Sequence, residues 1–169
     1  MGGTEMRIRK AKMNDWKDIQ YVAEQTWHDT YEGIIESTTR DIFLQTAYNE
    51  EMLEKRISSS QFFVAEVEGR VVGFIQLTLK EGAIWELTAL YILPTIQKQG
   101  VGTALFNTAL ERLEVERLDV LVETENKKGL AFYRSKGFEV VNQFQESFMG
   151  STLHSTEMQL YVKVEQVKK

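Results

Sequence analysis

The spacing of hydrophobic residues changes several times along the chain, and each change predicts a new element. Helical spacing extends over residues 16–31. Further helices are predicted at 37–47, after residue 49, over 102–113 and over 127–136. Alternation of apolar and polar residues predicts strands instead. The expected strands are 6–10, 61–67, 71–79, 83–93, 118–124, 138–146 and 154–164, with a polar loop between the last two.

Residues with turn and capping preferences stand at the borders of these segments. Asn14 and Asp15 precede the first helix and Asn49 precedes the third, where their side chains can accept free backbone N–H groups. Gly69 and Gly82 each follow a glutamate between two alternating stretches, which predicts tight hairpin turns. Residues 61–93 are therefore expected to form an antiparallel meander of three strands.

The predicted order is one strand, three helices, three strands, a helix, a strand, a helix and two strands. This order is typical of an α/β sandwich with a mixed sheet. The 169 residues contain no linker, repeat or low-complexity segment and are expected to form a single domain, 1–169. Residues 1–5 have no apolar stretch, and we expect them to be a disordered lead-in.

Composition excludes several kinds of partner and site. The net charge is −5 and the pI is about 5.2, whereas general nucleic-acid binders have a basic face. The chain has no cysteine and two histidines, so we expect neither a disulfide framework nor a bound metal. It also has no signal peptide and no long apolar run for a membrane, which favours a cytoplasmic protein.

Two glycines, Gly100 and Gly102, stand where a predicted strand ends and a predicted helix begins, in the stretch QKQGVGT. The first N–H groups of a helix lack intrahelical partners and carry the positive end of its dipole, so such a turn can hold a phosphate. Glycines can equally serve only to make a sharp turn. The loop lacks the Gly-Lys-Ser/Thr of a Walker loop and the third glycine of a dinucleotide fingerprint.

Three further segments resolve most of this ambiguity. Gln97-x-x-Gly100-x-Gly102 resembles the Q/R-x-x-G-x-G/A motif of the GCN5-related N-acetyltransferase (GNAT) superfamily. The strand ELTALYILP precedes it, VETEN ends the next predicted strand at Asn126, and GLAFYRSKGF places Tyr133 seven residues later. The resemblance extends from about residue 62 to 163. It implies a three-layer α/β sandwich with a central mixed, largely antiparallel sheet.

The resemblance implies that acetyl-CoA is the cofactor. Backbone groups of Leu90, Tyr91 and Ile92 would meet the pantetheine arm and the acetyl group, and the strand would separate from its neighbour there. Gln97 fits the motif, and Asn126 matches an Asn that contacts the cofactor arm, although it could simply cap the helix after it. The pyrophosphate would be held by the backbone amides of Lys98, Gln99, Gly100, Val101, Gly102 and Thr103.

The resemblance also implies direct attack of an amine on the thioester. Tyr133 matches a tyrosine that acts as general acid toward the CoA sulfur, and a phenol is normally protonated at neutral pH. Packing of Tyr133 in the core is the alternative. A backbone N–H near Tyr91 or Ile92 would suit the oxyanion. Glu86 matches a catalytic or water-holding glutamate, and a structural strand acid is its alternative.

The acceptor side would come from the first helices and the closing hairpin. Trp27, His28 and Tyr31 in QTWHDTYEGII could hold an alkylammonium, although Trp27 and Tyr31 also have the spacing of core anchors. These features are loosely similar to bacterial spermidine/spermine N-acetyltransferases, so a small amine such as a polyamine is the expected acceptor. A protein N-terminal or lysine acetyltransferase and a non-catalytic acyl-CoA sensor remain alternatives. Dimers are common in the superfamily, which leaves a homodimer open.

Overall fold

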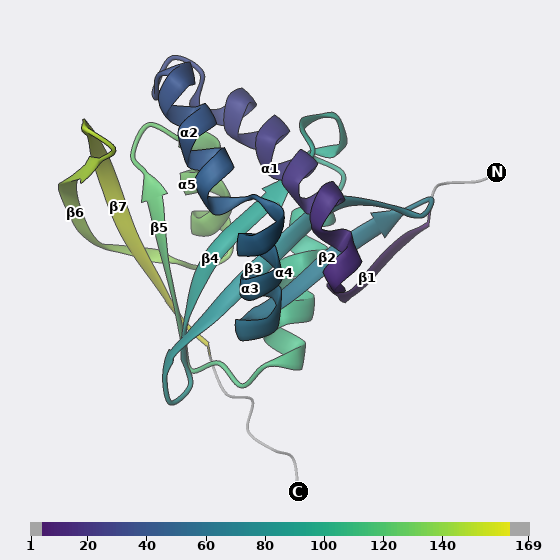
Figure 1. Ribbon diagram of the computed structural model, residues 1–169. Coiled ribbons are helices and arrows are strands. Elements are labelled where there is room, and N and C mark those ends of the chain that lie inside the picture. Colours follow the sequence, from purple (N-terminus) through teal and green to yellow (C-terminus); the bar gives the residue numbers. More distant parts are fainter. Residues whose placement is uncertain (1–4, 163–169) are drawn as a thin grey trace, which may run out of the picture. The chain divides into compact units, whose positions relative to one another are not determined.

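The structure is a computed structural model, and it describes residues 5–162. These residues form seven strands, five α-helices and two short 3-10 helices in the predicted order (Figure 1). Apart from Glu5, the expected lead-in lies outside the described residues, as do the last two residues of the strand predicted at 154–164. The strands are β1 Met6–Lys10, β2 Gln61–Val67, β3 Arg70–Glu81, β4 Ile84–Ile92, β5 Arg117–Glu123, β6 Glu139–Phe148 and β7 Ser151–Tyr161. The helices are η1 Met13–Asp15, α1 Trp16–Tyr31, α2 Ser37–Ala47, α3 Glu50–Ser59, η2 Pro94–Ile96, α4 Val101–Arg112 and α5 Lys127–Ser135.

The strands form one mixed sheet in the order β1-β2-β3-β4-β5-β7-β6. Pairs β1–β2, β2–β3, β5–β7 and β6–β7 are antiparallel, whereas β4 and β5 are parallel. The predicted α/β fold with a mixed, largely antiparallel sheet is therefore confirmed. The place of β7 between β5 and β6 depends on long-range pairing, which the periodicity of a single strand does not specify.

The chain divides into two compact units, which are described separately here. The first contains the described residues up to Leu77 together with Ala89–Arg112. The second contains Thr78–Thr88 and the described residues from Leu113 onward. Because β3 and β4 contribute residues to both units, the single domain expected for 1–169 stays a prediction.

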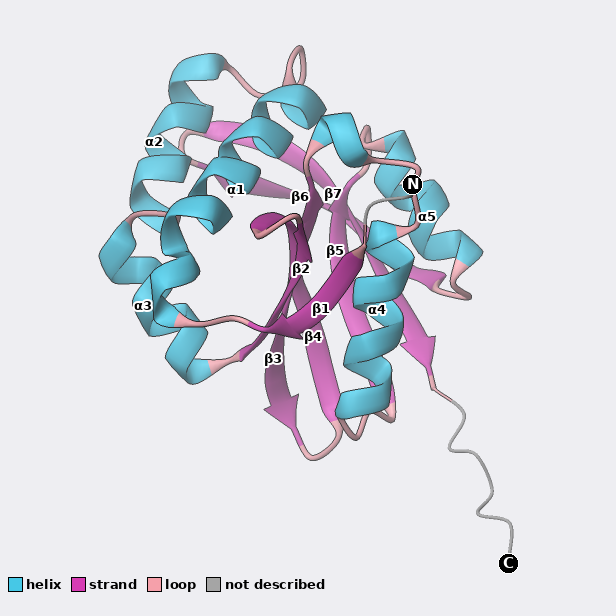
Figure 2. Cartoon of the chain, turned by 90° about the vertical axis from the view of Figure 1, so that its right-hand side faces the viewer, coloured by secondary structure: helices cyan, strands magenta, loops and turns pink. Residues whose placement is uncertain are grey.

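In the first unit, helices cover both faces of the strands. Helices α1, α2 and α3 lie on one face and α4 lies on the other (Figure 2). Side chains from every layer are fully buried, which is what the helical and alternating hydrophobic patterns require. They include Ile19 and Leu53 from the helices of one face, Phe63 and Phe74 from the strands, and Leu105 from α4.

In the second unit, α5 packs on β5 and β7. A Cβ placed on Gly129 of α5 would lie 3.2 Å from Val122 Cγ1 of β5, and one on Gly137 would lie 3.3 Å from Leu160 Cδ1 of β7. Gly137 has a φ of 101°, the left-handed conformation expected where this helix ends. Leu118 of β5 and Met158 of β7 are fully buried.

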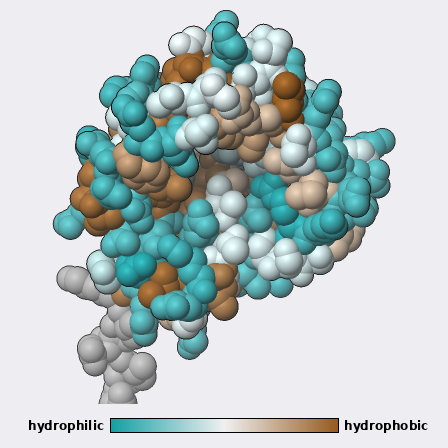
Figure 3. Space-filling view, turned by 60° about the vertical axis from the view of Figure 1, so that its left-hand side comes forward, coloured by the Kyte–Doolittle hydropathy of each residue, from teal (hydrophilic) through white to brown (hydrophobic). Residues whose placement is uncertain are grey.

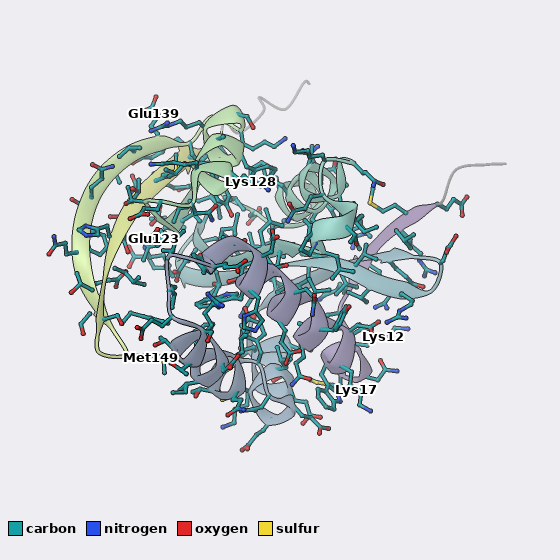
Figure 4. All side chains as sticks on the ribbon, turned by 90° about the horizontal axis from the view of Figure 1, so that it is seen from above. Lys12, Lys17, Glu123, Lys128, Glu139 and Met149 are labelled. Carbon is teal, nitrogen blue, oxygen red and sulfur yellow. The ribbon has the colours of Figure 1, made fainter. Side chains whose placement is uncertain are left out.

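The hairpin between β6 and β7 corrects one prediction. The polar loop expected between residues 146 and 154 is wrong, because the two strands continue to Phe148 and from Ser151. Met149, labelled in Figure 4, and Gly150 have φ values of 50° and 86°, which suit a two-residue turn. Such a turn matches the twist of the flanking strands and lets their pairing extend to Phe148 and Ser151.

The two predicted N-caps have different outcomes. Asn49 is confirmed, because its Oδ1 accepts the Met52 N–H at 2.8 Å. The prediction that Asp15 or Asn14 caps α1 is wrong, since the N-cap residue Asp15 makes no such bond. A 3-10 turn precedes the helix, and the Asp15 carboxylate instead accepts the Lys12 N–H and two hydrogen bonds from Arg9 of β1.

Apolar side chains that stay on the surface are dispersed along the chain. On the face drawn in Figure 3, hydrophobic residues form separated patches among hydrophilic ones. The most exposed of them belong to different elements: Tyr161, Ile42, Leu79 and Val141. Within residues 5–162, none of the helices combines the length and apolar character that a membrane span requires. A homodimer and a cytoplasmic location stay predictions.

The Arg9–Asp15 pair predicts a pH-dependent stability. Burial opposes ionisation of Asp15, but hydrogen bonds from Arg9 and the Lys12 N–H outweigh it, so the pKa of Asp15 lies below its ordinary value. A lowered pKa stabilises the fold above the ordinary value of about 3.9, and this contribution is lost as pH falls through the folded-state pKa. Asp15→Asn should therefore lower the free energy of unfolding by about 1–3 kcal/mol at pH 7 and by less at pH 3.

Urea unfolding at pH 7, 5 and 3 measures this difference. Asp29→Asn is the control, because Asp29 is an exposed carboxylate on α1 without an ion pair to residues 5–162. An Asp15→Asn loss of the same size at pH 3 and pH 7 would contradict the assignment.

Candidate functional site

Contacts with β3 fix the backbone directions at the end of β4. A Cβ placed on Gly73 of β3 would lie 3.1 Å from the Tyr91 carbonyl oxygen, so this carbonyl faces β3. The Leu93 N–H donates to the Val72 carbonyl of β3 at 2.9 Å. In a trans peptide, the C=O and the following N–H point in opposite directions. Both the N–H and the C=O of Ile92 therefore point away from β3.

Gly73 also allows β3, β4 and α4 to approach one another closely. Its Cβ would lie 2.7 Å from Ile92 Cδ1 and 3.4 Å from Val101 Cγ1. A side chain at this position would force Ile92 Cδ1 to move and would crowd the Tyr91 carbonyl oxygen. The alternating pattern does not distinguish Gly73 from its neighbours, but an isolated glycine within a strand is a signal that could have identified it.

Two residues in the loop before α4 have left-handed backbone conformations. Lys98 and Gly100 are exposed and have positive φ values of 69° and 84°. The Ala104 N–H donates to the carbonyl of Gly100, the residue directly before α4. A Cβ on Gly100 would meet no atom within 4 Å. Helix α4 thus begins beside open space.

Gln97 makes a contact that the sequence motif does not indicate. Its Nε2 donates to the Ile92 carbonyl at 3.2 Å, and Thr26 Oγ1 of α1 donates to the same oxygen at 3.2 Å. A carbonyl oxygen has two lone pairs, so both are occupied. Gln97 therefore supports the backbone of β4, whereas its predicted contact with the cofactor stays a prediction.

Trp27 lies in the core of the first unit. Its side chain is 6% exposed and stacks on Phe43 with ring centroids 4.1 Å apart. The indole Nε1 donates to the Tyr91 hydroxyl at 2.9 Å. These contacts favour the core-anchor alternative for Trp27 over a direct role in holding an amine.

The Tyr91 phenol is held in its protonated form. Burial raises its pKa well above the ordinary value, and the phenols of Tyr48 and Tyr31 add to the effect. The hydrogen bond from Trp27 lowers the pKa but does not offset burial. Because the Trp27 N–H can only donate, Tyr91 accepts from it and keeps its own proton.

His28 and Tyr31 belong to a structural network around Arg40. Arg40 is 8% exposed, donates to His28 Nδ1 at 3.0 Å, and donates to the carbonyls of Tyr31 and Ile35 at 3.1 and 2.6 Å. His28 Nε2 lies 3.4 Å from Asp41 Oδ1. The network links α1 to α2, so these contacts favour a structural role for His28. No periodic signal in the sequence singles out Arg40, since charged residues of helices are usually exposed.

Asn126 caps α5 in the second unit. Its Oδ1 accepts the Gly129 N–H at 3.0 Å, which is the capping alternative of the sequence prediction. The side-chain amide nitrogen makes no hydrogen bond within residues 5–162. A Cβ on Gly129 would lie 2.7 Å from that nitrogen, so Gly129 provides the room in which Asn126 lies.

Tyr133 lies on α5 and is 8% exposed. Its ring packs edge-on against Phe138 and Phe132, with centroids 5.2 and 5.3 Å apart. These contacts agree with the core-packing alternative, and they also fix the direction of the ring. The proposed role as general acid stays a prediction.

Glu86 lies on β4 in the part that belongs to the second unit. It is half-buried and makes no ion pair or side-chain hydrogen bond in the described part of the chain. Its partner in the parallel β4–β5 register is Asp119, which Arg117 and Lys80 bind at 2.8 and 2.7 Å. Glu86 thus has an uncommitted carboxylate, as a base or water-holding group needs, beside an acid that is already neutralised.

Glu123 is an acid that the motif comparison did not single out. It ends β5, is labelled in Figure 4, and is 9% exposed. Its Oε1 accepts the Glu125 N–H at 2.7 Å, and no ion pair to it occurs within residues 5–162. A short polar stretch at a strand end usually indicates a turn. The sequence therefore gives no sign that the Glu123 carboxylate is buried.

The described site residues belong to two groups. The first unit holds the end of β4, the loop from Gln97 to Thr103, and Trp27, His28 and Tyr31. The second holds Glu86, Asn126 and Tyr133.

Sequence comparisons identify relatives with one kind of activity. Residues 58–140 match the family model described as acetyltransferase (GNAT) domain. The chain is 27% identical over 144 residues to a spermidine N(1)-acetyltransferase of Thermoplasma acidophilum, which covers 80% of this chain and 89% of that protein. It is 36% identical over 113 residues to the uncharacterized N-acetyltransferase YuaI of Bacillus subtilis, which covers 63% of each.

Solved structures share the fold. The PaiA N-acetyltransferase from Thermoplasma acidophilum, in complex with coenzyme A, has a TM-score of 0.81 at 24% identity and covers 94% of this chain and 99% of that one. The ribosomal-protein-S18-alanine N-acetyltransferase from Escherichia coli has a TM-score of 0.72 at 16% identity and covers 98% and 100%. With the family match and the sequence relatives, these findings confirm the resemblance to the GNAT family of acetyltransferases, whose domain model residues 58–140 match.

Proposed function

We propose that this protein transfers an acetyl group from acetyl-CoA to a primary amine of a small molecule, by direct attack of the amine on the thioester. The observation that carries the proposal is the exposed loop at Lys98 and Gly100, which begins α4 beside open space. This loop directly follows the end of β4, where the Ile92 N–H points away from β3. When bound, acetyl-CoA supplies the activated acetyl group.

The residues present fit the cofactor. Backbone N–H groups at the start of a helix bind phosphate through hydrogen bonds and the helix dipole. The open space at Gly100 leaves this turn accessible to a phosphate. In the second unit, the Asn126 amide nitrogen is available to donate to the cofactor arm while Oδ1 caps α5.

Backbone directions support one of the two proposed oxyanion donors. The two predicted donors are the N–H groups of Tyr91 and Ile92. The Tyr91 N–H follows the Leu90 carbonyl along the chain, and the Tyr91 carbonyl faces β3. The Ile92 carbonyl is occupied by Thr26 and Gln97, but the Ile92 N–H makes neither of these contacts. We assign oxyanion stabilisation to the Ile92 N–H, because a donor must be directed in advance at the place where charge develops.

Proton transfer is assigned to the two residues that the resemblance indicates. Tyr133, whose ring is fixed by Phe132 and Phe138, would protonate the departing thiolate. Glu86, whose carboxylate has no ion pair among the described residues, would accept the ammonium proton directly or through a water. Both assignments rest on the match to the family motif together with these contacts.

The class of acceptor has weaker support. A polyamine is supported by the Thermoplasma relative, whose name gives it as a spermidine N(1)-acetyltransferase, and by the net charge of −5, which attracts cations. Trp27, proposed as an amine contact, is engaged with Tyr91 and Phe43, so it would act only indirectly. Acetylation of protein N-termini and non-catalytic acyl-CoA binding are the alternatives that an assay must distinguish.

Replacement of Gly100 should weaken CoA binding specifically. Gly33 and Gly100 have the same φ of 84°, and a Cβ on either meets no atom within 4 Å. Alanine at each position should cost about 1–2 kcal/mol of stability through left-handed strain. Gly100→Ala should in addition weaken CoA binding about tenfold, as measured by calorimetry, because a methyl group enters the proposed phosphate site. Equal CoA affinities of the two variants would exclude this loop as the cradle.

Tyr133→Phe should lower the rate of acetyl transfer much more than the affinity for CoA. We expect kcat to fall about 100-fold, because the general acid is lost, while CoA affinity changes less than about threefold. Release of free CoA should be measured with spermidine and other polyamines, amino acids, aminoglycosides and N-terminal peptides. Tyr21→Phe, which removes an exposed phenol on α1, is the control. CoA binding by the parent without turnover on any amine would refute the enzymatic proposal and favour a sensor.

A further inference from the structure

Two adjacent residues of α1 contact the end of β4 through polar bonds. Thr26 Oγ1 donates to the Ile92 carbonyl at 3.2 Å, and Trp27 Nε1 donates to the Tyr91 hydroxyl at 2.9 Å. Thr26 and Trp27 are each 6% exposed. A buried donor without an acceptor is costly, so both bonds are strongly preferred over their loss. One turn of α1 is thereby tied to two successive residues of β4.

The contacts around Ile92 fix both of its peptide planes. The plane before it is directed by the Tyr91 carbonyl, which faces Gly73. The plane after it is held by the Leu93 N–H bond to Val72 on one side and by Thr26 and Gln97 on the other. Since peptide planes rotate only about φ and ψ, the direction of the Ile92 N–H is determined by these contacts.

Aromatic rings pack against one another on the helix side of this arrangement. Trp27 is stacked on Phe43, and the Tyr91 ring packs edge-on against Phe74 with centroids 5.4 Å apart. Tyr48 lies beside Tyr91, and the guanidinium carbon of Arg56 lies 4.3 Å from the centre of the Tyr48 ring. Close-packed interiors transmit small displacements, so a shift of α1 would reach the end of β4.

We infer that Thr26 and Trp27 are positioning residues, which set the Ile92 N–H toward the thioester carbonyl through their bonds to the Ile92 carbonyl and the Tyr91 hydroxyl. The inference rests on the proposed function and adds residues of α1 that touch neither the cofactor nor the reacting atoms. It also gives Trp27 a role in the reaction that does not involve contact with the amine. A displaced oxyanion donor loses much of its effect, because the stabilisation depends on its direction.

The test removes the hydroxyl groups of Thr26 and Tyr91 by substitutions that change the shape of each side chain little. Thr26→Val removes the donor to Ile92, Tyr91→Phe removes the acceptor of the Trp27 N–H, and Thr26→Ser restores a donor as the conservative rescue. We expect the first two variants to lower kcat about five- to thirtyfold, with KM for acetyl-CoA changed less than about threefold. Thr26→Ser should recover most of the parent kcat.

A second readout does not depend on turnover. In ¹H–¹⁵N spectra of the labelled full chain, the Ile92 amide should differ in shift between the CoA-bound and acetyl-CoA-bound states, since only the latter carries a thioester carbonyl. This difference should be strongly reduced in Thr26→Val.

The two readouts, kcat and the Ile92 amide shift difference, distinguish failure of the positioning role from failure of the proposed function. If the parent acetylates amines but Thr26→Val and Tyr91→Phe keep its kcat, the positioning role is overturned and the proposed function stands. If the parent acetylates no amine while the Ile92 difference is present and depends on Thr26, positioning stands and the transferase proposal fails. A buried hydroxyl with only a structural role would lower the melting temperature without either effect.

Discussion

The absence of a side chain at Gly73 is the constraint on which the first unit depends. A Cβ there would lie 2.7 Å from Ile92 Cδ1 and 3.1 Å from the Tyr91 carbonyl oxygen, so its absence lets the end of β4 pack closely on β3. This packing fixes the direction of the Ile92 N–H together with the Leu93 bond to Val72 and the bonds of Thr26 and Gln97 to the Ile92 carbonyl. Glycine in a strand interior normally destabilises the strand, and it occurs where another backbone must approach closely.

Backbone groups supply most of the proposed cofactor contacts. Helix N–H groups and strand amides are present whatever the side chains are, so this part of the site depends on turn conformation and close packing. Side chains act mainly as supports: Gln97 and Thr26 hold the Ile92 carbonyl, and Asn126 caps α5. Recognition of a particular amine must instead depend on the side chains around it. The chemistry of acetyl transfer does not determine which side chains these are.

The residues proposed for the amine show how tertiary contacts redirect an interpretation. Trp27, His28 and Tyr31 form an aromatic and polar group in the sequence, yet Trp27 is buried and His28 accepts from Arg40. Asp15 likewise has the composition of an N-cap but binds Arg9 of β1. In both cases a contact made in the folded chain replaces the role that the local sequence suggested. A desolvated donor must find an acceptor, and the fold decides which acceptor is near.

The sequence by itself determined the element order, nearly all element bounds, the resemblance to the GNAT family and the position of the loop before α4. These depend on local periodicity, on glycines with positive φ such as Gly100 and Gly137, and on short motifs. Tertiary structure decided the insertion of β7 between β5 and β6, the length of the β6–β7 hairpin, the hydrogen bond of Gln97 to Ile92, and the burial of Trp27 and Glu123. Those features result from long-range pairing and from the direction of single side chains, for which a periodic pattern carries no information.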